Sequence, residues 1–408
     1  NEYGQLGNNS TVSSSTPVAV TGLSGVTAIA AGPHHTCTPL SDGTVKCWGF
    51  NGAGELGNGI SGSFSLIPVE VLGIGGNGHL SGVAEIAAGG EFTCALHSDG
   101  TVKCWGNNGS GQLGNNSTTN SSTPVAVLGT GGLDYLSGAT AIAANIERIC
   151  ALLSDGTVKC WGRNDYGQLG NNSTTNSGTP VAVFGVDGVG FLGGAAAIAA
   201  GGYHTCAALS DGTINCWGYN NSGQLGNGTS MNSSTPVMVN GNFALPVDGA
   251  TKVATGYHHT CALLSDGTVK CWGYNEYGQI GNGTTTNSSA PVAVNDLNGS
   301  TEVAGTYHTC ALLSDGNMKC WGDNSYGALG DGTTTDRHTP VSVSDLTGAS
   351  AVAVAASHTC ALLSNGTVKC WGRNSAGQLG DGTDIDRHTP VAVMVGPGEE
   401  DFLSGVTA

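Results

Sequence analysis

Residues 258–281 read HHTCALLSDGTVKCWGYNEYGQIG, and this stretch is one of seven copies that differ by small changes. Two strand-like runs, TCALL and TVKCW, flank the turn tripeptide Ser-Asp-Gly at 265–267. A three-residue loop with Gly267 at positive φ places Cys261 directly opposite Cys271. A two-residue turn would instead place the two cysteines on opposite faces of the hairpin. The first arrangement predicts a hairpin whose strands are joined by a disulfide.

The same ten-residue step separates two cysteines in every copy. The fourteen cysteines form seven pairs: Cys37 with Cys47, Cys94 with Cys104, Cys150 with Cys160, Cys206 with Cys216, Cys261 with Cys271, Cys310 with Cys320, and Cys360 with Cys370. A zinc site would show Cys-x-x-Cys or Cys/His clusters, and the sequence has none. Reduced thiols packed in the core are the alternative. We expect seven disulfides and therefore an oxidising compartment, which is secreted, periplasmic or cell-surface.

The composition describes an acidic, glycine-rich chain. Its 408 residues include 69 glycines and only 12 Lys and Arg, and the net charge is −17. Nucleic acids and anionic membranes bind basic surfaces, so this balance argues against both as partners. No apolar run approaches the ~18 residues of a membrane helix, so we expect no membrane insertion. The chain begins at Asn1, inside a repeat, and we interpret it as a processed or resolved portion of a longer secreted product.

The repeat has a period near 50 residues. The tryptophan of each Cys-Trp-Gly stands at Trp48, Trp105, Trp161, Trp217, Trp272, Trp321 and Trp371. The steps between them are 57, 56, 56, 55, 49 and 50 residues. Short strands and Gly-rich turns at this period predict β-propeller blades. Helical periodicity is absent, so we expect an all-β fold of seven four-stranded blades, each with one disulfide-stapled hairpin.

Each repeat supplies four strand candidates, exemplified by residues 26–32, 36–40, 44–48 and 67–71. The first candidate is rich in Ala and Gly, which suits the crowded centre of a propeller. The fourth contains Pro68, which is tolerated at a sheet edge and poorly in a central strand. We therefore expect the strands of a blade to follow one another in chain order from centre to edge.

The repeats predict one propeller domain over residues 1–408, with whole blades from about 23 to 395. Residues 1–22 and 396–408 are then overhanging or ring-closing segments. One alternative places the N-terminal strand, near residues 16–20, at the outer edge of the last blade. Either terminal copy of the repeat can close the ring.

The run W-G-x-N-x-x-G-Q-L-G-x-G, followed by T-P-V and V-x-x-I-A-A-G-x-x-H-T-C-A-L, resembles the regulator of chromosome condensation repeat. The match covers essentially the whole chain. The resemblance implies a seven-bladed β-propeller. The family includes a nuclear guanine nucleotide exchange factor and a secreted bacterial inhibitor of β-lactamases. The paired cysteines depart from the nuclear members and favour the secreted bacterial type, so the fold alone leaves the function open.

No residues have the arrangement of an active site, so we expect neither enzyme activity nor a cofactor. The Ser-Asp-Gly tripeptides are interpreted as turns. Histidines precede the first cysteine strand in five repeats, at His35, His204, His259, His308 and His358. Phe92 and Arg148 stand at that position in two others and interrupt any metal-binding ring. We expect each histidine to satisfy backbone groups of its own blade.

Two loops near the C-terminus are acidic. They carry Asp331, Asp336, Asp381, Asp384 and Asp386. Carboxylates of this kind bind calcium, but the spacing is not that of a calcium loop, and Arg337 and Arg387 can pair with the acids. Sequons such as Asn227-Gly228-Thr229 are candidate glycosylation sites. Calcium and glycans are therefore secondary expectations.

The link between the fourth strand and the next repeat is lengthened in four consecutive copies and carries apolar residues. With the last copy, it yields a candidate interaction surface of Leu80, Tyr135, Leu136, Phe191, Leu192, Phe243 and Phe402. One interpretation is that these side chains fold back over the blade edges. The other is an apolar patch that binds a protein partner.

These features predict a secreted or cell-surface structural or interaction module. The first hypothesis is a surface or appendage protein that self-assembles, for instance into filaments, through terminal strands or a propeller face. The alternative is a soluble extracellular propeller that binds or inhibits a protein. The expected partner is a protein, which includes copies of the chain itself.

Overall fold

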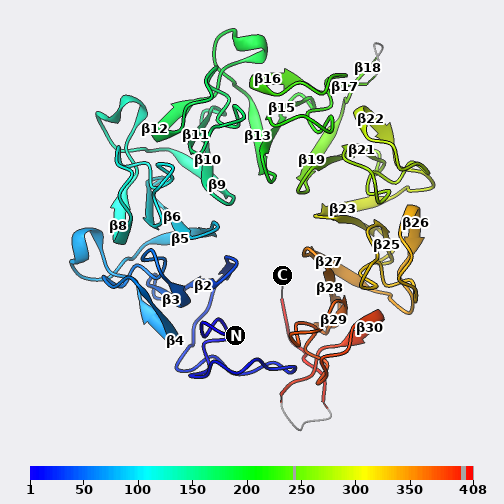
Figure 1. The fold of residues 1–408 in the computed structure, drawn as a ribbon, viewed down its shortest axis with the longest axis horizontal. Helices are drawn as coiled ribbons and strands as arrows, with labels where there is room; N and C mark the ends of the chain where they lie inside the picture. Colours follow the sequence, from blue (N-terminus) through cyan, green and yellow to red (C-terminus); the bar gives the residue numbers. More distant parts are fainter. Residues whose placement is uncertain (242–244, 397–400, 408) are drawn as a thin grey trace. The chain divides into compact units, whose positions relative to one another are not determined.

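The computed structural model describes residues 1–241, 245–396 and 401–407. In these residues the chain forms seven four-stranded antiparallel sheets (Figure 1). Within every sheet the strands are hydrogen-bonded in chain order, as the sequence predicts. The fold class is therefore an all-β, seven-bladed propeller.

The strands are short, and most sheets repeat the same lengths. The sheets contain, in chain order, β1 (Ala30–Ala31), β2 (His35–Pro39), β3 (Val45–Asn51) and β4 (Ser63–Glu70); β5 (Val83–Ala88), β6 (Phe92–His97), β7 (Val102–Gly106) and β8 (Ser121–Ala126); β9 (Ala139–Ala144), β10 (Arg148–Leu153), β11 (Val158–Gly162) and β12 (Ser177–Ala182); β13 (Ala195–Ala200), β14 (His204–Leu209), β15 (Ile214–Gly218) and β16 (Ser233–Met238); β19 (Ala250–Thr255), β20 (His259–Leu264), β21 (Val269–Gly273) and β22 (Ser288–Ala293); β23 (Ser300–Gly305), β24 (His308–Leu313), β25 (Met318–Gly322) and β26 (Arg337–Ser342); and β27 (Ala349–Val354), β28 (His358–Leu363), β29 (Val368–Gly372) and β30 (Arg387–Ala392). The links between sheets contain the 3-10 turns η1 (Ile74–Gly76), η2 (Thr130–Gly132) and η3 (Val186–Gly188), and the pair β17 (Asn240–Gly241) with β18 (Leu245–Pro246).

The central hairpin has the predicted register. Cys261 of β20 lies opposite Cys271 of β21. Gly267 closes the turn with a φ of 78°, a value that a side chain at this position would strain. The amide of Gly267 donates to the carbonyl of Leu264, at 3.0 Å, which completes the turn. The Ser-Asp-Gly tripeptide therefore determines which residues of the two strands face each other.

All seven predicted disulfides are present, one in each sheet. Each joins the second and third strands, with the two Cα atoms 4.1 Å apart. The bonds join Cys37 to Cys47, Cys94 to Cys104, Cys150 to Cys160, Cys206 to Cys216, Cys261 to Cys271, Cys310 to Cys320, and Cys360 to Cys370. Among the residues that the structure describes, no cysteine is free.

The disulfides belong to the hydrophobic core and do not form an accessible site. Every cysteine of a third strand is buried, namely Cys47, Cys104, Cys160, Cys216, Cys271, Cys320 and Cys370. Their second-strand partners are buried as well, except for the partly buried Cys360 of the last sheet. These fourteen residues therefore have a structural role, and any binding surface has to be sought elsewhere.

The hydrophobic core is divided into clusters that lie between neighbouring sheets. In one cluster, the disulfide of Cys310 and Cys320 packs with Leu329 and with Trp371 of the next repeat. Trp371 is fully buried, and its Nε1 donates to the carbonyl of Ala328, 2.8 Å away. Clusters of the same composition lie around Trp105, Trp161, Trp272 and Trp321. Each disulfide in these clusters therefore helps to pack one sheet against the next as well as closing its own hairpin.

Two compact units can be distinguished by their internal contacts. One contains residues 1–12, 19–200 and 232–236, and includes the first three sheets. The other contains residues 13–18, 201–231 and 237–408, and includes the last three sheets. In the described residues of both units, no helix is long and apolar enough to cross a membrane.

Residues 13–18 contact the last repeat of their own unit. The amide of Gly382 donates to the carbonyl of Ser15 at 2.8 Å, as the amide of Gly332 donates to His388 of the following sheet at 2.9 Å. The edge of the last sheet is occupied by β30, which pairs with β29. The N-terminal strand therefore does not take that edge, contrary to one alternative drawn from the sequence.

Candidate interaction surface

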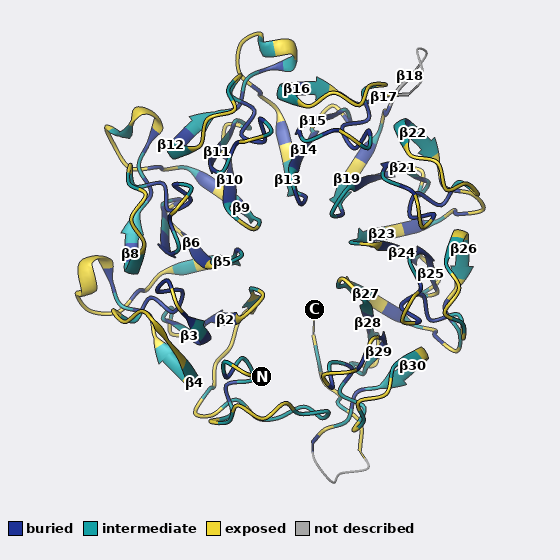
Figure 2. Ribbon diagram, in the orientation of Figure 1, coloured by how far each residue is buried: buried dark blue, intermediate teal, exposed yellow. Residues whose placement is uncertain are grey.

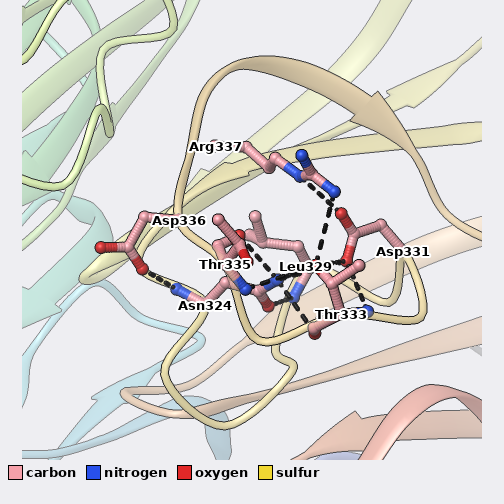
Figure 3. Close-up of polar contacts among 7 residues, drawn as sticks. All are labelled: Asn324, Leu329, Asp331, Thr333, Thr335, Asp336 and Arg337. Atoms are coloured by element: carbon pink, nitrogen blue, oxygen red, sulfur yellow. Dashed lines mark hydrogen bonds and ion pairs between the residues drawn. The ribbon is translucent and has the colours of Figure 1, made fainter.

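A single buried asparagine organises the long loop after each Cys-Trp-Gly. Asn324 donates through Nδ2 to the carbonyls of Thr333 and Thr335, both at 3.1 Å, and its Oδ1 accepts from the amide of Leu329 at 3.0 Å (Figure 3). Equivalent asparagines stand at Asn51, Asn108, Asn164, Asn220, Asn275 and Asn374, and each is nearly or fully buried. A loop without regular secondary structure is thus held in one conformation by one side chain.

The acidic loops use their carboxylates to hold this conformation. Asp331 accepts from Arg337 Nε at 2.6 Å, and Asp381 pairs with Arg387 in the same way (Figure 3). Burial alone would raise the pKa of Asp331, but hydrogen bonds from Thr333 and Arg337 hold this pKa below its ordinary value. The described residues contain no group of three or more His, Cys, Asp or Glu side chains placed to hold a metal ion. The arginine pairing considered from the sequence is the one observed.

The histidine row connects neighbouring sheets. His259 Nε2 lies 2.9 Å from Thr309 Oγ1 of the next sheet, and that hydroxyl donates to the carbonyl of Gln279. Trp321 Nε1 donates to the same carbonyl. His35, His204 and His308 make the same contact with a threonine. For these four histidines the expectation of bonding within their own blade was wrong, because the ring reaches across to the next sheet.

His35, His259 and His308 are neutral structural groups. Burial, with a smaller contribution from His308, lowers the pKa of His259 to about 3. Burial likewise lowers the pKa of His35 and of His308 to about 4. Phe92 and Arg148 occupy the equivalent register, opposite Gly106 and Gly162, as the sequence indicates. The row therefore supports packing between sheets.

One copy of the loop carries Glu55 where six others, including the partial copy at the N-terminus, carry glutamine and one carries Ala328. The side chain of Gln112 accepts from the amide two residues before it, and Glu55 Oε2 accepts from Ala53 in the same way, at 2.9 Å. Glu55 is fully buried, and its Oε1 has no hydrogen-bond partner among the described residues. Burial raises the pKa of Glu55 to about 7, and the nearby charge of Glu91 adds to the rise.

We expect Glu55→Gln to stabilise the protein at pH 8 by about 2 kcal/mol, because the ionised carboxylate is buried without full hydrogen bonding. A raised pKa in the folded state means that protonation stabilises the wild type as the pH falls from about 7 towards the ordinary value of 4.5. The gain should therefore shrink at pH 5. Urea unfolding at both pH values measures it, with the exposed Glu2→Gln as control. Equal stability of Glu55→Gln and wild type at pH 8 would contradict the prediction.

The insert links fold into small hooks. In the second sheet's link, Leu128 pairs with Tyr135 in a β-bridge, and the amide of Leu136 donates to the carbonyl of Val127 at 3.0 Å. The same bridge joins Phe184 to Phe191, whose rings stack with centroids 5.6 Å apart. These backbone contacts give the hooks a defined conformation, and the tips of the hooks are exposed (Figure 2).

The structure separates the predicted surface residues into two groups. Leu80, Leu136 and Leu192 are buried, and the first two belong to the clusters between sheets, so they are core residues and not part of a surface. The neighbouring Tyr135 and Phe191 are 66% and 65% exposed. Phe402 is also exposed and bridges to Met394. Phe243 lies outside the described residues.

Two exposed residues were missed from the sequence. Leu133 is 88% exposed and Val189 is 79% exposed, each two residues before the aromatic residue of its hook. The signal was the repeated pattern of an apolar residue, a spacer, an aromatic residue and leucine. With Ile74 at the tip of the first hook, they complete a set that we call the insert surface: Ile74, Leu133, Tyr135, Val189 and Phe191.

The arrangement of repeated four-stranded sheets with variable exposed loops defines a protein-interaction module. The sequence profile of the RCC1-like domain matches residues 1–304 and 77–407. The chain therefore belongs to the RCC1-like domain family, as the repeat motif predicts. Propellers of this family are generally binding or regulatory folds. The seven disulfides indicate an oxidising environment.

A light receptor and a ubiquitin-protein ligase are among the proteins similar to this chain. The ultraviolet-B receptor UVR8 of Arabidopsis thaliana is 30% identical over 297 residues, covering 72% of this chain and 64% of UVR8. The E3 ubiquitin-protein ligase HERC2 of Homo sapiens is 29% identical over 310 residues, covering 72% of this chain and 6% of HERC2. The chain thus spans less than two thirds of the length of each of these relatives.

Solved structures share the fold. Human WBSCR16 matches with a TM-score of 0.66 and 23% identity, over 86% of this chain and 94% of that one. Yeast RCC1 (Prp20), in a complex with Kap60, matches with a TM-score of 0.63 and 20% identity, over 92% of this chain and 89% of that one. At these identities the likeness shows the propeller fold alone.

Proposed function

We propose that the chain is an extracellular interaction module that self-assembles through its insert surface, in the manner of a surface or appendage protein. The observation that carries the proposal is the series of exposed apolar side chains on hooks of fixed conformation. Leu133, Tyr135 and Phe191 are each more than half exposed, although their neighbours Leu136 and Leu192 are buried. The extracellular setting is supported by the disulfide in every sheet.

The repetition of the hooks favours a second copy of the chain as the partner. The tip of each hook packs beside the fourth strand of the next sheet, where a Cβ on Gly132 would lie 3.7 Å from Thr179 and one on Gly188 3.5 Å from Thr235. Two consecutive hooks of one unit therefore present the same apolar motif, whereas the first hook carries Asn77 and His79 at these positions and adds only Ile74. Single apolar side chains on a surface need no explanation, so it is the recurrence of the motif on neighbouring hooks that supports a binding site. In a two-fold symmetric dimer both copies use the same surface patch, so the hooks of one copy are placed to contact the hooks of another.

Multi-angle light scattering after size exclusion tests the proposal, together with electron microscopy. At about 100 μM we expect a dimer or larger assembly of the wild type, and a monomer when Leu133, Tyr135 and Phe191 are all replaced by serine. The control replaces Ile60, Met231 and Ile385 by serine, because these exposed apolar residues lie outside the hooks. The control should assemble like the wild type.

The thermal midpoint distinguishes a surface role from a core role. We expect the triple serine variant to unfold within a few degrees of the wild type, because the three side chains are exposed in the folded chain. A monomeric wild type at every concentration would overturn self-assembly and favour the soluble binder or inhibitor. A large loss of stability in the variant would show that the three replaced side chains pack in the core and do not form a surface.

A further inference from the structure

Two loop positions in each repeat are joined by a backbone hydrogen bond but carry different side chains from repeat to repeat. The amide of Tyr219 donates to the carbonyl of Tyr203, and the amide of Tyr274 to that of His258, both at 3.0 Å. The pairs are His34 with Phe50, Glu91 with Asn107, Glu147 with Arg163, Tyr203 with Tyr219, His258 with Tyr274, Tyr307 with Asp323, and Ser357 with Arg373. Because the backbone contact is constant, the fold does not require any particular side chain at these positions. The side chains at these positions are therefore free to serve the binding of a partner.

Aromatic rings gather at these positions in three consecutive repeats of one unit. Tyr257 lies with its ring centroid 4.9 Å from that of His258 and 5.6 Å from that of Tyr307. The ring of His258 lies 6.2 Å from Tyr203 and 6.2 Å from Tyr274. We call the connected set the tyrosine patch: Tyr203, Tyr219, Tyr257, His258, Tyr274, Tyr277 and Tyr307.

The patch is accessible and uncharged at its rings. Tyr277 and Tyr307 are exposed, and the other rings are partly buried. A hydrogen bond with Tyr203 raises the pKa of Tyr257 to about 12, so its phenol stays neutral. Burial of Tyr274, with a hydrogen bond from its hydroxyl to Glu276 at 2.8 Å, raises the pKa of that phenol also. The phenols of Tyr257 and Tyr274 are therefore neutral, and the exposed rings of Tyr277 and Tyr307 are the part of the patch that a partner can reach.

Acidic residues accompany the rings. Glu276 hydrogen-bonds to Tyr274, and Asp323 is paired through its amide with the carbonyl of Tyr307. The chain as a whole has a net charge of −17. Aromatic faces attract cations through the quadrupole of the ring, and neighbouring carboxylates add to this attraction. Neutral π-faces beside carboxylates match a cationic partner and oppose an anionic one.

The protein itself shows a cation on a tyrosine of the same loop type. The guanidinium carbon of Arg373 lies 5.3 Å from the ring centroid of Tyr326. Arg373 occupies the loop position that Tyr274 occupies in the fifth sheet's repeat. Tyr326 stands two residues after Asn324, as Tyr277 stands two residues after Asn275. The loops of this fold are thus compatible with an arginine seated on a tyrosine ring.

We propose that the tyrosine patch is a docking surface for a segment of a partner protein rich in arginine or lysine. The tyrosine patch shares no residue with the insert surface, so binding at the patch does not depend on self-assembly. A neutral oligosaccharide is the competing ligand for an aromatic surface. It would gain no charge attraction from Glu276 and Asp323, whereas a cationic segment would.

The probe is a fluorescent peptide of alternating arginine and glycine, measured by fluorescence polarisation against the intact oxidised chain. Its control is the same peptide with citrulline, which has the shape of arginine without the charge. We expect the arginine peptide to bind and the citrulline peptide not to bind. Replacing Tyr277 and Tyr307 by alanine should weaken binding about tenfold, whereas phenylalanine at both positions should preserve it because the π-face remains.

Two further variants make the assignment specific. Tyr326→Ala removes a tyrosine that is as exposed as Tyr277 but lies outside the patch, beneath Arg373, and should leave peptide binding unchanged. Glu276→Gln should weaken binding, and more so at low salt. Equal binding by the wild type and the double alanine variant would mean that the net charge of the chain, and not the tyrosine rings, attracts the peptide. This result would overturn the proposal. So would binding of a maltose or chitin oligosaccharide at the patch in place of the peptide.

Discussion

Asn275→Ala is expected to lower the free energy of unfolding by about 4 kcal/mol, because alanine leaves several buried backbone groups without partners. Asn275 is fully buried, and its Nδ2 donates to the carbonyls of Thr284 and Thr286 at 2.9 and 3.0 Å. Its Oδ1 accepts from the amide of Ile280 at 3.0 Å. Alanine can make none of these three contacts, so the loop should lose its conformation.

Urea denaturation measures the loss, and hydrogen exchange locates it at the amide of Ile280. The control is Thr285→Ala, since Thr285 is an exposed residue of the same loop. Asn275→Asp separates the two halves of the network, because aspartate keeps the acceptor and loses the donor. It should also be strongly destabilised, with the Ile280 amide better protected than in the alanine variant. A loss below about 1 kcal/mol for Asn275→Ala would show that water substitutes for the side chain.

Replacing Cys261 and Cys271 together by alanine is expected to cost about 3 kcal/mol, mostly through the freedom that the unfolded chain regains. The two residues are ten apart in sequence, and both are buried between sheets. Loss of the sulfur atoms from the core adds to the cost. The same substitution at Cys310 and Cys320 should have a similar effect, because the closed loop has the same length and the same surroundings.

Reduction of the wild type tests the contribution of all seven disulfides together. Intact-mass measurement should show a rise of about 14 Da on full reduction, one hydrogen for each sulfur. The reduced wild type should unfold at a lower denaturant concentration than the double alanine variant in its oxidised form, because the variant retains six disulfides. An unfolding midpoint unaffected by reductant would mean that the disulfides contribute nothing to stability.

The hairpins were predictable because their information is local. The turn tripeptide before Thr268 and the ten-residue step between Cys261 and Cys271 are enough to set the register. The strand order within a sheet followed from the same kind of evidence, since Pro68 excludes its strand from a central position. Both inferences depend on residues that are close together in sequence.

The contacts between sheets were not predictable in this way. The partner of His259 is Thr309, 50 residues further on, and nothing near His259 indicates it. Tyr135 and Leu136 are adjacent and both apolar, yet one is exposed and the other is buried. Only the hydrogen bond that folds the hook back onto Val127 decides between them. The tyrosine patch was missed because its rings come from three successive repeats.

The hairpin disulfides have a consequence for proteolysis. Six of the 12 lysines and arginines lie between the two cysteines of a hairpin, at Lys46, Lys103, Lys159, Lys270, Lys319 and Lys369. A trypsin-like protease that cut after one of these lysines would leave both fragments covalently joined by the sulfur bridge. The nicked strand would stay hydrogen-bonded between its neighbours, and the chain would keep its mass, apart from one added water, until the bridge was reduced. Cleavage at these six lysines should therefore release separate fragments only after reduction, whereas cleavage at the other six Lys and Arg residues, which lie outside the disulfide loops, needs no reductant.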